Sequence, residues 1–102
     1  MTANQERFFE MVCNPDTDPD AIFTYFRENR KEIDLETPYG EQRETLFHIL
    51  AKNGDDSILD GLLRDLSSIE ICKLLTAKDA HGNVPLSVGT KSTLDVMLYH
   101  LR

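Results

Sequence analysis

The sequence predicts an all-α fold, an α-solenoid of stacked antiparallel helix pairs joined by longer polar loops. Apolar residues recur at spacings of three and four in several segments, as they do on one face of a helix. Helix start and stop signals separate these segments. Two series of apolar residues repeat at a constant spacing of 36 positions. The first is Ile22, Ile58 and Leu94, and the second is Phe26, Leu62 and Leu98. A period in the thirties with two helices in each unit is typical of a solenoid.

The first two helices are expected at residues 3–13 and from Pro19 onward. Asp18 suits the N-cap of the second helix, because its side chain can accept a free backbone N–H, and proline suits the first helical position. Their aromatic residues should lie mainly in the core of the first unit, with one or two on the terminal face as the alternative. These residues are Phe8, Phe9, Phe23, Tyr25 and Phe26.

A polar segment with a turn at Pro38 and Gly40 leads to the next helices. The third helix lies within residues 44–54 and ends at Gly54, a residue that readily adopts the left-handed conformation needed there. Residues 55–66 carry an apolar stripe formed by Ile58, Leu59, Leu62, Leu63 and Leu66. A fourth helix is therefore expected in this segment.

A short additional helix is expected at residues 67–75, where Ser67 and Glu70 have the spacing of a capping box. Gly82 and Pro85 mark the turn that follows it. The last helix, residues 92–101, presents Leu94, Met97, Leu98 and Leu101 on its apolar face. Near its end, His100 is suited to interact with the helix dipole.

The whole chain, residues 1–102, is interpreted as a single domain. Residues 1–36 form an N-terminal capping repeat, and residues 37–75 form a central repeat that includes the additional helix. Residues 76–102 form a C-terminal repeat. Because each unit needs neighbours to bury its faces, self-association through the terminal repeats is expected as a further property.

Two stretches resemble ankyrin repeats. TLFHILAKNGDDSILDGLL (45–63) is similar to the pattern T-P-L-H-x-A-A-x-x-G and the helix after it. AKDAHGNVPLSV (77–88) is similar to the loop and helix entry D-x-x-G-x-T-P-L-H, whereas residues 1–35 match more weakly, as a terminal repeat does. The matching positions are Thr45, His48, Ala51, Gly54, Ile58, Leu62, Leu63, Asp79, Gly82, Pro85 and Leu86.

The chain departs from the ankyrin pattern at several positions. Leu46 replaces the proline of the central repeat, and Val84 and Ser87 replace the threonine and histidine of the last one. The first loop carries about three additional residues between Gly40 and Thr45. This variant resembles ankyrin proteins of intracellular bacteria, so delivery into a host cell is an alternative to a resident cytoplasmic protein.

His48 has a structural and a catalytic interpretation. The ankyrin resemblance implies that Thr45 and His48 connect the loop to the helix start, which imidazole can do by donating from one nitrogen and accepting at the other. Catalysis would need a nucleophile or base held within hydrogen-bonding reach. Cys13 and Cys72 are assigned to the core, so the structural role is favoured. Gly54, Gly82 and Pro85 are likewise assigned structural roles.

Charge and cysteine usage limit the partners and the compartment. With 18 acidic and 11 basic residues, the net charge is −7, so neither nucleic acids nor membranes are expected as partners. A protein with a basic patch is favoured by steering, although this charge also serves solubility. Cys13 and Cys72 are expected as buried, reduced thiols, with a disulfide as the alternative. We therefore expect a cytoplasmic protein without a metal or a cofactor.

The ankyrin resemblance implies β-hairpin-like finger loops and a concave binding face. The leading hypothesis is a protein-protein interaction module that binds through these finger loops and this face. The alternatives are an adaptor or effector fragment of a larger ankyrin protein or assembly, and a small enzyme that uses His48. His81 is expected at a loop tip, where partner contact and plain solvation are both open. The resemblance implies these contact residues: Pro38, Tyr39, Glu41, Gln42, Arg43, Lys52, Asp55, Ala80, His81 and Asn83.

Overall fold

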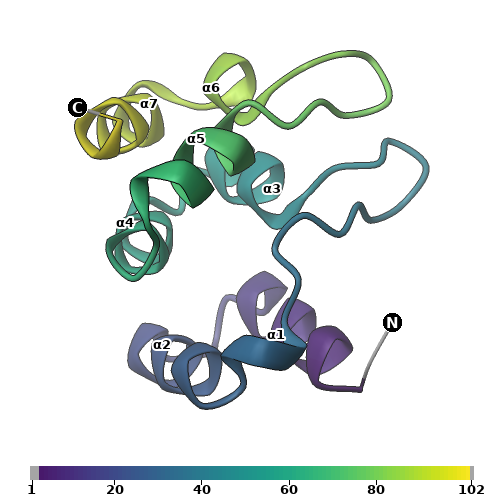
Figure 1. Cartoon of the computed structure of the whole chain (residues 1–102), viewed down its shortest axis with the longest axis vertical. Coiled ribbons are helices and arrows are strands. Elements are labelled where there is room, and N and C mark those ends of the chain that lie inside the picture. The colour runs from purple at the N-terminus through teal and green to yellow at the C-terminus, as the bar shows by residue number, and fades with distance from the viewer. Residues whose placement is uncertain (1–2, 102) are drawn as a thin grey trace. The chain divides into compact units, whose positions relative to one another are not determined.

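The structure is a computed structural model that describes residues 3–101. These residues contain seven α-helices, one 3-10 helix and no β-strand (Figure 1). The predicted all-α class is therefore confirmed. The chain divides into two compact units, Met1–Asp34 and Leu35–Arg102. This division falls close to the predicted end of the first repeat at residue 36.

The first unit contains α1 (Ala3–Cys13), α2 (Pro19–Glu28) and the 3-10 helix η1 (Arg30–Glu32). The start of α2 is the predicted one, because the Asp18 carboxylate accepts the N–H of Asp20 at 3.0 Å and Pro19 occupies the first helical position. Helices α1 and α2 pack against each other. Phe8 and Phe26 are fully buried and stack with ring centroids 5.5 Å apart.

Gln5 is a buried polar residue that the apolar pattern of α1 does not reveal. Its Nε2 donates to the carbonyl oxygen of Asp34 at 2.9 Å, and its Oε1 accepts the N–H of Asp34 at 2.6 Å. One side chain thus satisfies both backbone groups of Asp34 at the end of the unit. The other predicted aromatic core residues, Phe9, Phe23 and Tyr25, are only half-buried.

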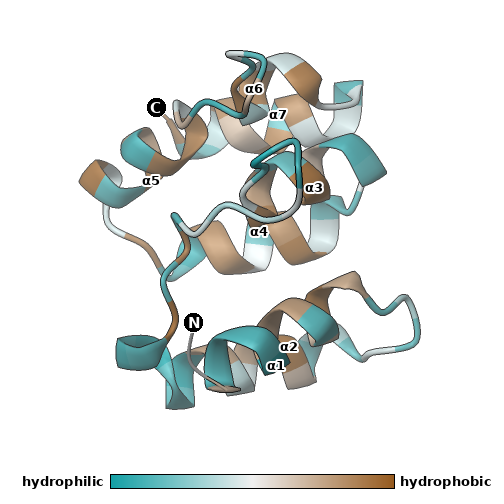
Figure 2. Ribbon diagram, turned by 90° about the vertical axis from the view of Figure 1, so that its right-hand side faces the viewer, coloured by the Kyte–Doolittle hydropathy of each residue, from teal (hydrophilic) through white to brown (hydrophobic). Residues whose placement is uncertain are grey.

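The second unit contains five helices. They are α3 (Leu46–Asn53), α4 (Asp56–Arg64), α5 (Ser68–Leu75), α6 (Pro85–Val88) and α7 (Lys91–His100). Helix α3 packs against α4 and α6, and α4 packs against α7. Hydrophobic residues lie along the ribbons of these helices, as Figure 2 shows for α3 and α4.

The helix ends in this unit follow the predicted signals. Thr45 is the N-cap of α3, and Gly54 ends it in the left-handed conformation at φ 75°. The N–H of Glu70 donates a hydrogen bond to the Ser67 hydroxyl at 3.2 Å, and the N–H of Ser67 donates one to the Glu70 carboxylate at 3.2 Å. The predicted capping box of α5 is confirmed.

The buried face of α7 differs from the predicted one. Leu98 is 45% exposed, whereas Thr93 and Met97 are fully buried. Burial of Thr93 is possible because its hydroxyl donates to the carbonyl oxygen of Ala51 at 3.0 Å, so no polar group is left unpaired. The constant spacing of 36 therefore does not describe the buried residues of α7, and the assignment of Leu98 to the core is wrong.

The predicted burial of Cys13 and Cys72 is also wrong. Both cysteines are exposed. Cys13 is the last residue of α1, and Cys72 lies on a part of α5 that faces solvent, while Ile71, Leu74 and Leu75 take the buried positions. Exposed apolar residues also occur at Ile69, Leu98 and Tyr99.

Candidate functional site

The first finger loop, residues 36–45, precedes α3. Tyr39 and Glu44 exchange two backbone hydrogen bonds at 2.8 and 3.1 Å and close a loop of residues 40–43. Within it, the N–H of Arg43 donates to the carbonyl oxygen of Gly40 at 3.2 Å. The expected β-hairpin is thus reduced to one isolated bridge, because no second residue pair extends the ladder and residues 3–101 contain no strand.

The second finger loop, residues 76–84, is closed by Asp79. One carboxylate oxygen of Asp79 accepts the N–H groups of His81 and Asn83, both at 2.9 Å. The N–H of Asp79 in turn donates to the carbonyl oxygen of Asn83 at 2.9 Å. Gly82 supplies the left-handed position of this turn at φ 81°. The side chain of Asp79 therefore holds the tip of this loop in place.

The two finger loops lie beside each other on one side of the second unit (Figure 1). The N–H of Ala80 in the second loop donates to the carbonyl oxygen of Gln42 in the first at 2.8 Å. This bond joins residues that are far apart in the sequence and sets the spacing of the two tips.

His48 connects the loops to the start of α3. It is fully buried, and its Nδ1 lies 3.1 Å from the backbone N of Thr45 and 2.9 Å from the Thr45 hydroxyl. Its Nε2 lies 2.8 Å from the carbonyl oxygen of Asn83. Because an N–H only donates and a carbonyl only accepts, Nδ1 is the acceptor and Nε2 carries the proton. Both ring nitrogens are engaged, in agreement with the proposed structural role.

The remaining residues predicted to be structural occupy fitting positions. Thr45 is buried beside His48, and Pro85 is the buried first residue of α6. Gly54 and Gly82 both have positive φ angles.

The predicted contact residues of both loops are brought together by these bonds. Tyr39 is half-buried, and so is Asp55, which is the N-cap of α4. Lys52 is exposed on α3, and its Nζ lies 2.5 Å from the carboxylate of Glu44 at the base of the first loop. The other predicted residues are exposed, namely Pro38, Glu41, Gln42, Arg43, Ala80, His81 and Asn83.

The Asp79 carboxyl has a lowered pKa. Desolvation raises this pKa, but the backbone N–H groups of Asn83 and His81, with a smaller electrostatic contribution from the nearby imidazoles of His48 and His81, lower it below the usual 3.8. A carboxyl with a lowered pKa in the folded state contributes stability above its unfolded pKa. This contribution is lost as the pH falls through the folded pKa.

We therefore expect Asp79→Asn to be less stable than the wild type at neutral pH, since the amide oxygen can still accept the two N–H groups but carries no charge. The difference in urea midpoint between the two proteins should shrink at pH values below 3.8 and then vanish. Circular dichroism across a pH series measures it. A difference that stays constant into acid would contradict the role of the charge.

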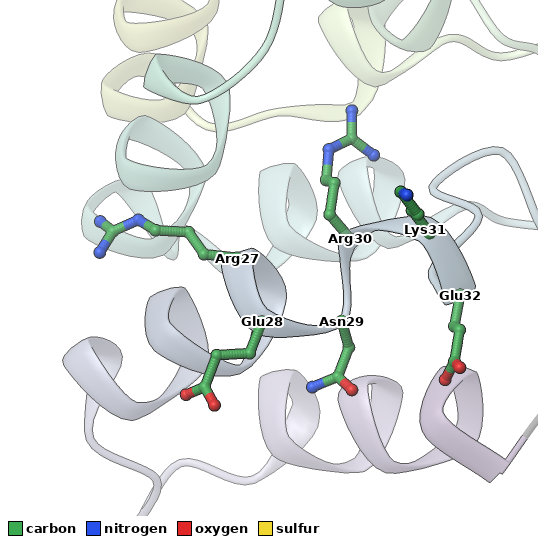
Figure 3. A pocket seen from close by; sticks show the side chains of 6 residues that line it. All are labelled: Arg27, Glu28, Asn29, Arg30, Lys31 and Glu32. Carbon is green, nitrogen blue, oxygen red and sulfur yellow. The ribbon is translucent and has the colours of Figure 1, made fainter.

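Residues 3–101 contain no group of three or more His, Cys, Asp or Glu that could hold a metal ion. None of the described helices is long and apolar enough to cross a membrane. A depression of about 320 Å³ lies in the first unit beside the turn after α2. Figure 3 shows Arg30 and Lys31 on the opposite side of this turn from Asn29 and Glu32, and Arg27 extending sideways from the end of α2.

This depression has a structural explanation. Arg27 lies in the last turn of α2, where a positive charge complements the helix dipole. The Arg30 guanidinium lies 4.9 Å from the ring centroid of Phe26, a cation–π contact. Arg27 and Arg30 therefore stabilise the end of α2, and the lining residues include no Ser, Thr, Cys or His.

Sequence reasoning missed three polar contacts of the second unit. It placed Asp79 in the loop without a role, although an aspartate at the start of a short loop is the signal of an Asx-turn. It did not pair Glu44 with Lys52. Nor did it foresee that His100 Nε2 lies 2.7 Å from Asp60, which also binds Arg64 at 3.0 Å. His100 thus links α7 to α4.

Comparison of the chain with models of protein families, with curated proteins and with solved structures gives no match. The ankyrin relationship therefore stays a prediction. A function has to be argued from the geometry of the second unit.

Proposed function

We propose that this chain is an ankyrin-type protein-protein interaction module that performs no chemistry of its own. It binds a partner protein through the two finger loops and the adjacent face of α3. The observation that carries this proposal is the connected set of hydrogen bonds from His48 to Asn83 and from Ala80 to Gln42. These bonds join two exposed loops into one surface.

Pre-organisation is what makes such a surface suited to binding. Ordering a flexible loop on binding costs free energy, and a loop already held in place avoids most of that cost. The first loop is closed by the Tyr39–Glu44 bridge and the second by Asp79. The tips then present exposed polar and charged side chains at fixed positions.

The arrangement of the second unit supports the ankyrin-type interpretation. Two helix pairs, α3 with α4 and α6 with α7, each follow a finger loop. His48 accepts a hydrogen bond from the backbone N–H of Thr45 at the start of α3. It donates one to the carbonyl oxygen of Asn83 in the second finger loop. A repeat built in this way fixes each loop to its neighbour, as a solenoid requires.

The same geometry disfavours catalysis by His48. A general base needs a ring nitrogen available to a substrate or nucleophile. Both nitrogens of His48 bind backbone or hydroxyl groups, and the side chain is fully buried. A binding role is therefore the better interpretation of this site.

A comparative pull-down tests the proposal. The variant Glu41→Lys, His81→Glu changes one exposed residue on each loop. The control Asp95→Lys, Ser92→Glu makes the same net change in charge at exposed positions of α7. Proteins retained specifically by the wild type should be bound about tenfold more weakly by the loop variant and equally well by the control, which corresponds to about 1.4 kcal/mol.

Each protein retained by the wild type is then purified, and its affinity for the wild type and both variants is measured by calorimetry. Equal affinity of the wild type and the loop variant would show that the finger loops are not the binding surface. Thermal unfolding of all three proteins ensures that a loss of binding does not come from unfolding.

A further inference from the structure

Arg43 has a backbone conformation that its residue type does not favour. Its φ angle is 53°, and it is the one residue other than glycine within 3–101 with a positive φ. The other positive values belong to Gly40, Gly54 and Gly82. In the left-handed region a Cβ approaches the following carbonyl oxygen, so glycine is favoured, and asparagine and aspartate are the next best tolerated. An arginine here is strained.

No interaction of the Arg43 side chain offsets this strain. The side chain is exposed, and among residues 3–101 it makes no hydrogen bond or ion pair. The adjacent acid, Glu44, binds Lys52 at 2.5 Å instead. The hydrogen bond that Arg43 does make comes from its backbone N–H, which donates to the carbonyl oxygen of Gly40. A strained residue whose side chain does nothing for the fold indicates a role of that side chain outside the fold.

The backbone on both sides of Arg43 is held in place. Gln42, before it, accepts the N–H of Ala80 from the second finger loop at 2.8 Å. Glu44, after it, pairs with Tyr39 in the isolated bridge. The backbone that carries the guanidinium group is therefore held in place next to the point where the first finger loop is bonded to the second, within the proposed binding surface.

We infer that Arg43 is a specificity-determining contact of this surface and that it binds a carboxylate of the partner protein. This inference rests on the proposed function. A guanidinium group presents parallel N–H donors that match the two oxygens of a carboxylate, and a pair of this kind gives both orientation and energy. The net charge of −7 acts at longer range and is screened over roughly 8 Å at physiological ionic strength, so it does not decide a direct contact.

The first test is of stability. Arg43→Gly removes both the strain and the side chain, so its urea midpoint should rise above that of the wild type. The matched control is Glu41→Gly, an exposed position of the same loop without a positive φ, where the midpoint should fall. If Arg43→Gly lowers the midpoint as Glu41→Gly does, the arginine serves the fold and the inference is wrong.

The second test is of recognition. Immobilised wild-type protein is used to select from a phage-displayed library of random peptides. Asp or Glu should be enriched about tenfold at one peptide position, an effect of the size expected for one charge-assisted contact. Selection on Arg43→Gly should lose this preference, and selection on Arg43→Glu should replace it with Lys or Arg. Arg43→Lys should weaken the preference, because an ammonium cannot bind both oxygens in parallel.

Synthetic versions of the enriched peptides, with either a free or an amidated C-terminus, distinguish a side-chain carboxylate from a terminal one. Unchanged acid enrichment on Arg43→Gly would overturn the inference. If peptide binding is lost in Glu41→Lys, His81→Glu but is unaffected by Arg43→Gly, the proposed function holds and only the role of Arg43 fails. If no peptide depends on the loops, both fail.

Discussion

Replacing His48 with alanine should lower the free energy of unfolding by about 3–4 kcal/mol, a large share of the roughly 5–15 kcal/mol of a small domain. The change removes a fully buried ring and leaves the N–H of Thr45 without its partner. It also cuts the bond from the ring to the carbonyl oxygen of Asn83. Urea unfolding followed by circular dichroism measures the loss.

Two further variants separate the two ends of the imidazole. His48→Asn places an oxygen near the position of Nδ1, so it should keep the contact with Thr45 and lose the one with Asn83. His48→Gln reaches towards the position of Nε2 and should do the reverse. Each should be less destabilising than alanine, because one hydrogen bond of about 1 kcal/mol is retained. The exposed His81→Ala serves as the control and should leave the midpoint nearly unchanged.

This experiment also separates the binding module from the enzyme alternative. If His48 holds the loops, partner binding should fall in proportion to the unfolded or rearranged fraction. A His48→Ala protein with wild-type stability would contradict the structural role and bring back the possibility of catalysis.

The helices could be predicted from the sequence because local signals determine them. The predicted first helix has the same bounds as α1, and Asp18 with Pro19 marks the start of α2 as expected. The capping box at Ser67 locates α5 within one residue of the predicted start. Each of these signals depends on residues no more than four positions apart, so no knowledge of the tertiary fold is needed.

The packing of the helices could not be predicted in the same way. A threonine is usually exposed, and burial of Thr93 against α3 is possible because the carbonyl oxygen of Ala51 lies within reach of its hydroxyl. The partner is 42 positions away in the sequence. The contact between His100 and Asp60 is equally distant. Apolar spacing alone therefore placed Leu98 in the core and overlooked the residues that take the buried positions.

For the candidate site, the sequence indicated which residues would lie in the loops but not how the loops are held. The ankyrin resemblance implies a contact between Thr45 and His48, and this contact is present. The role of the Asp79 carboxylate and the left-handed conformation of Arg43 depend on backbone angles that composition does not specify. Whether these loops bind a partner stays a prediction.

Replacing Gly89 with alanine should be almost as damaging as the loss of His48, for a different reason. A Cβ at this position would lie 2.7 Å from the Thr93 hydroxyl oxygen and 3.1 Å from the methyl carbon of Met97. Both residues are fully buried, so neither can move away freely. The hydroxyl would have to leave the carbonyl oxygen of Ala51, to which it donates at 3.0 Å. We expect a loss of about 2–4 kcal/mol from overpacking and the broken hydrogen bond.

A double-mutant cycle identifies the cause. Thr93→Ala alone should destabilise by about 1–2 kcal/mol, because the hydroxyl and its hydrogen bond are lost. In that background the alanine at position 89 meets no hydroxyl oxygen, so its additional effect should be smaller by about 1–2 kcal/mol than in the wild type. Simple additivity of the two changes would mean that the Thr93 hydroxyl is not the group that excludes a side chain at position 89. The clash would then lie with Met97 or with the Cβ of Ala51, 3.4 Å away, and Met97→Ala would be the variant that relieves it.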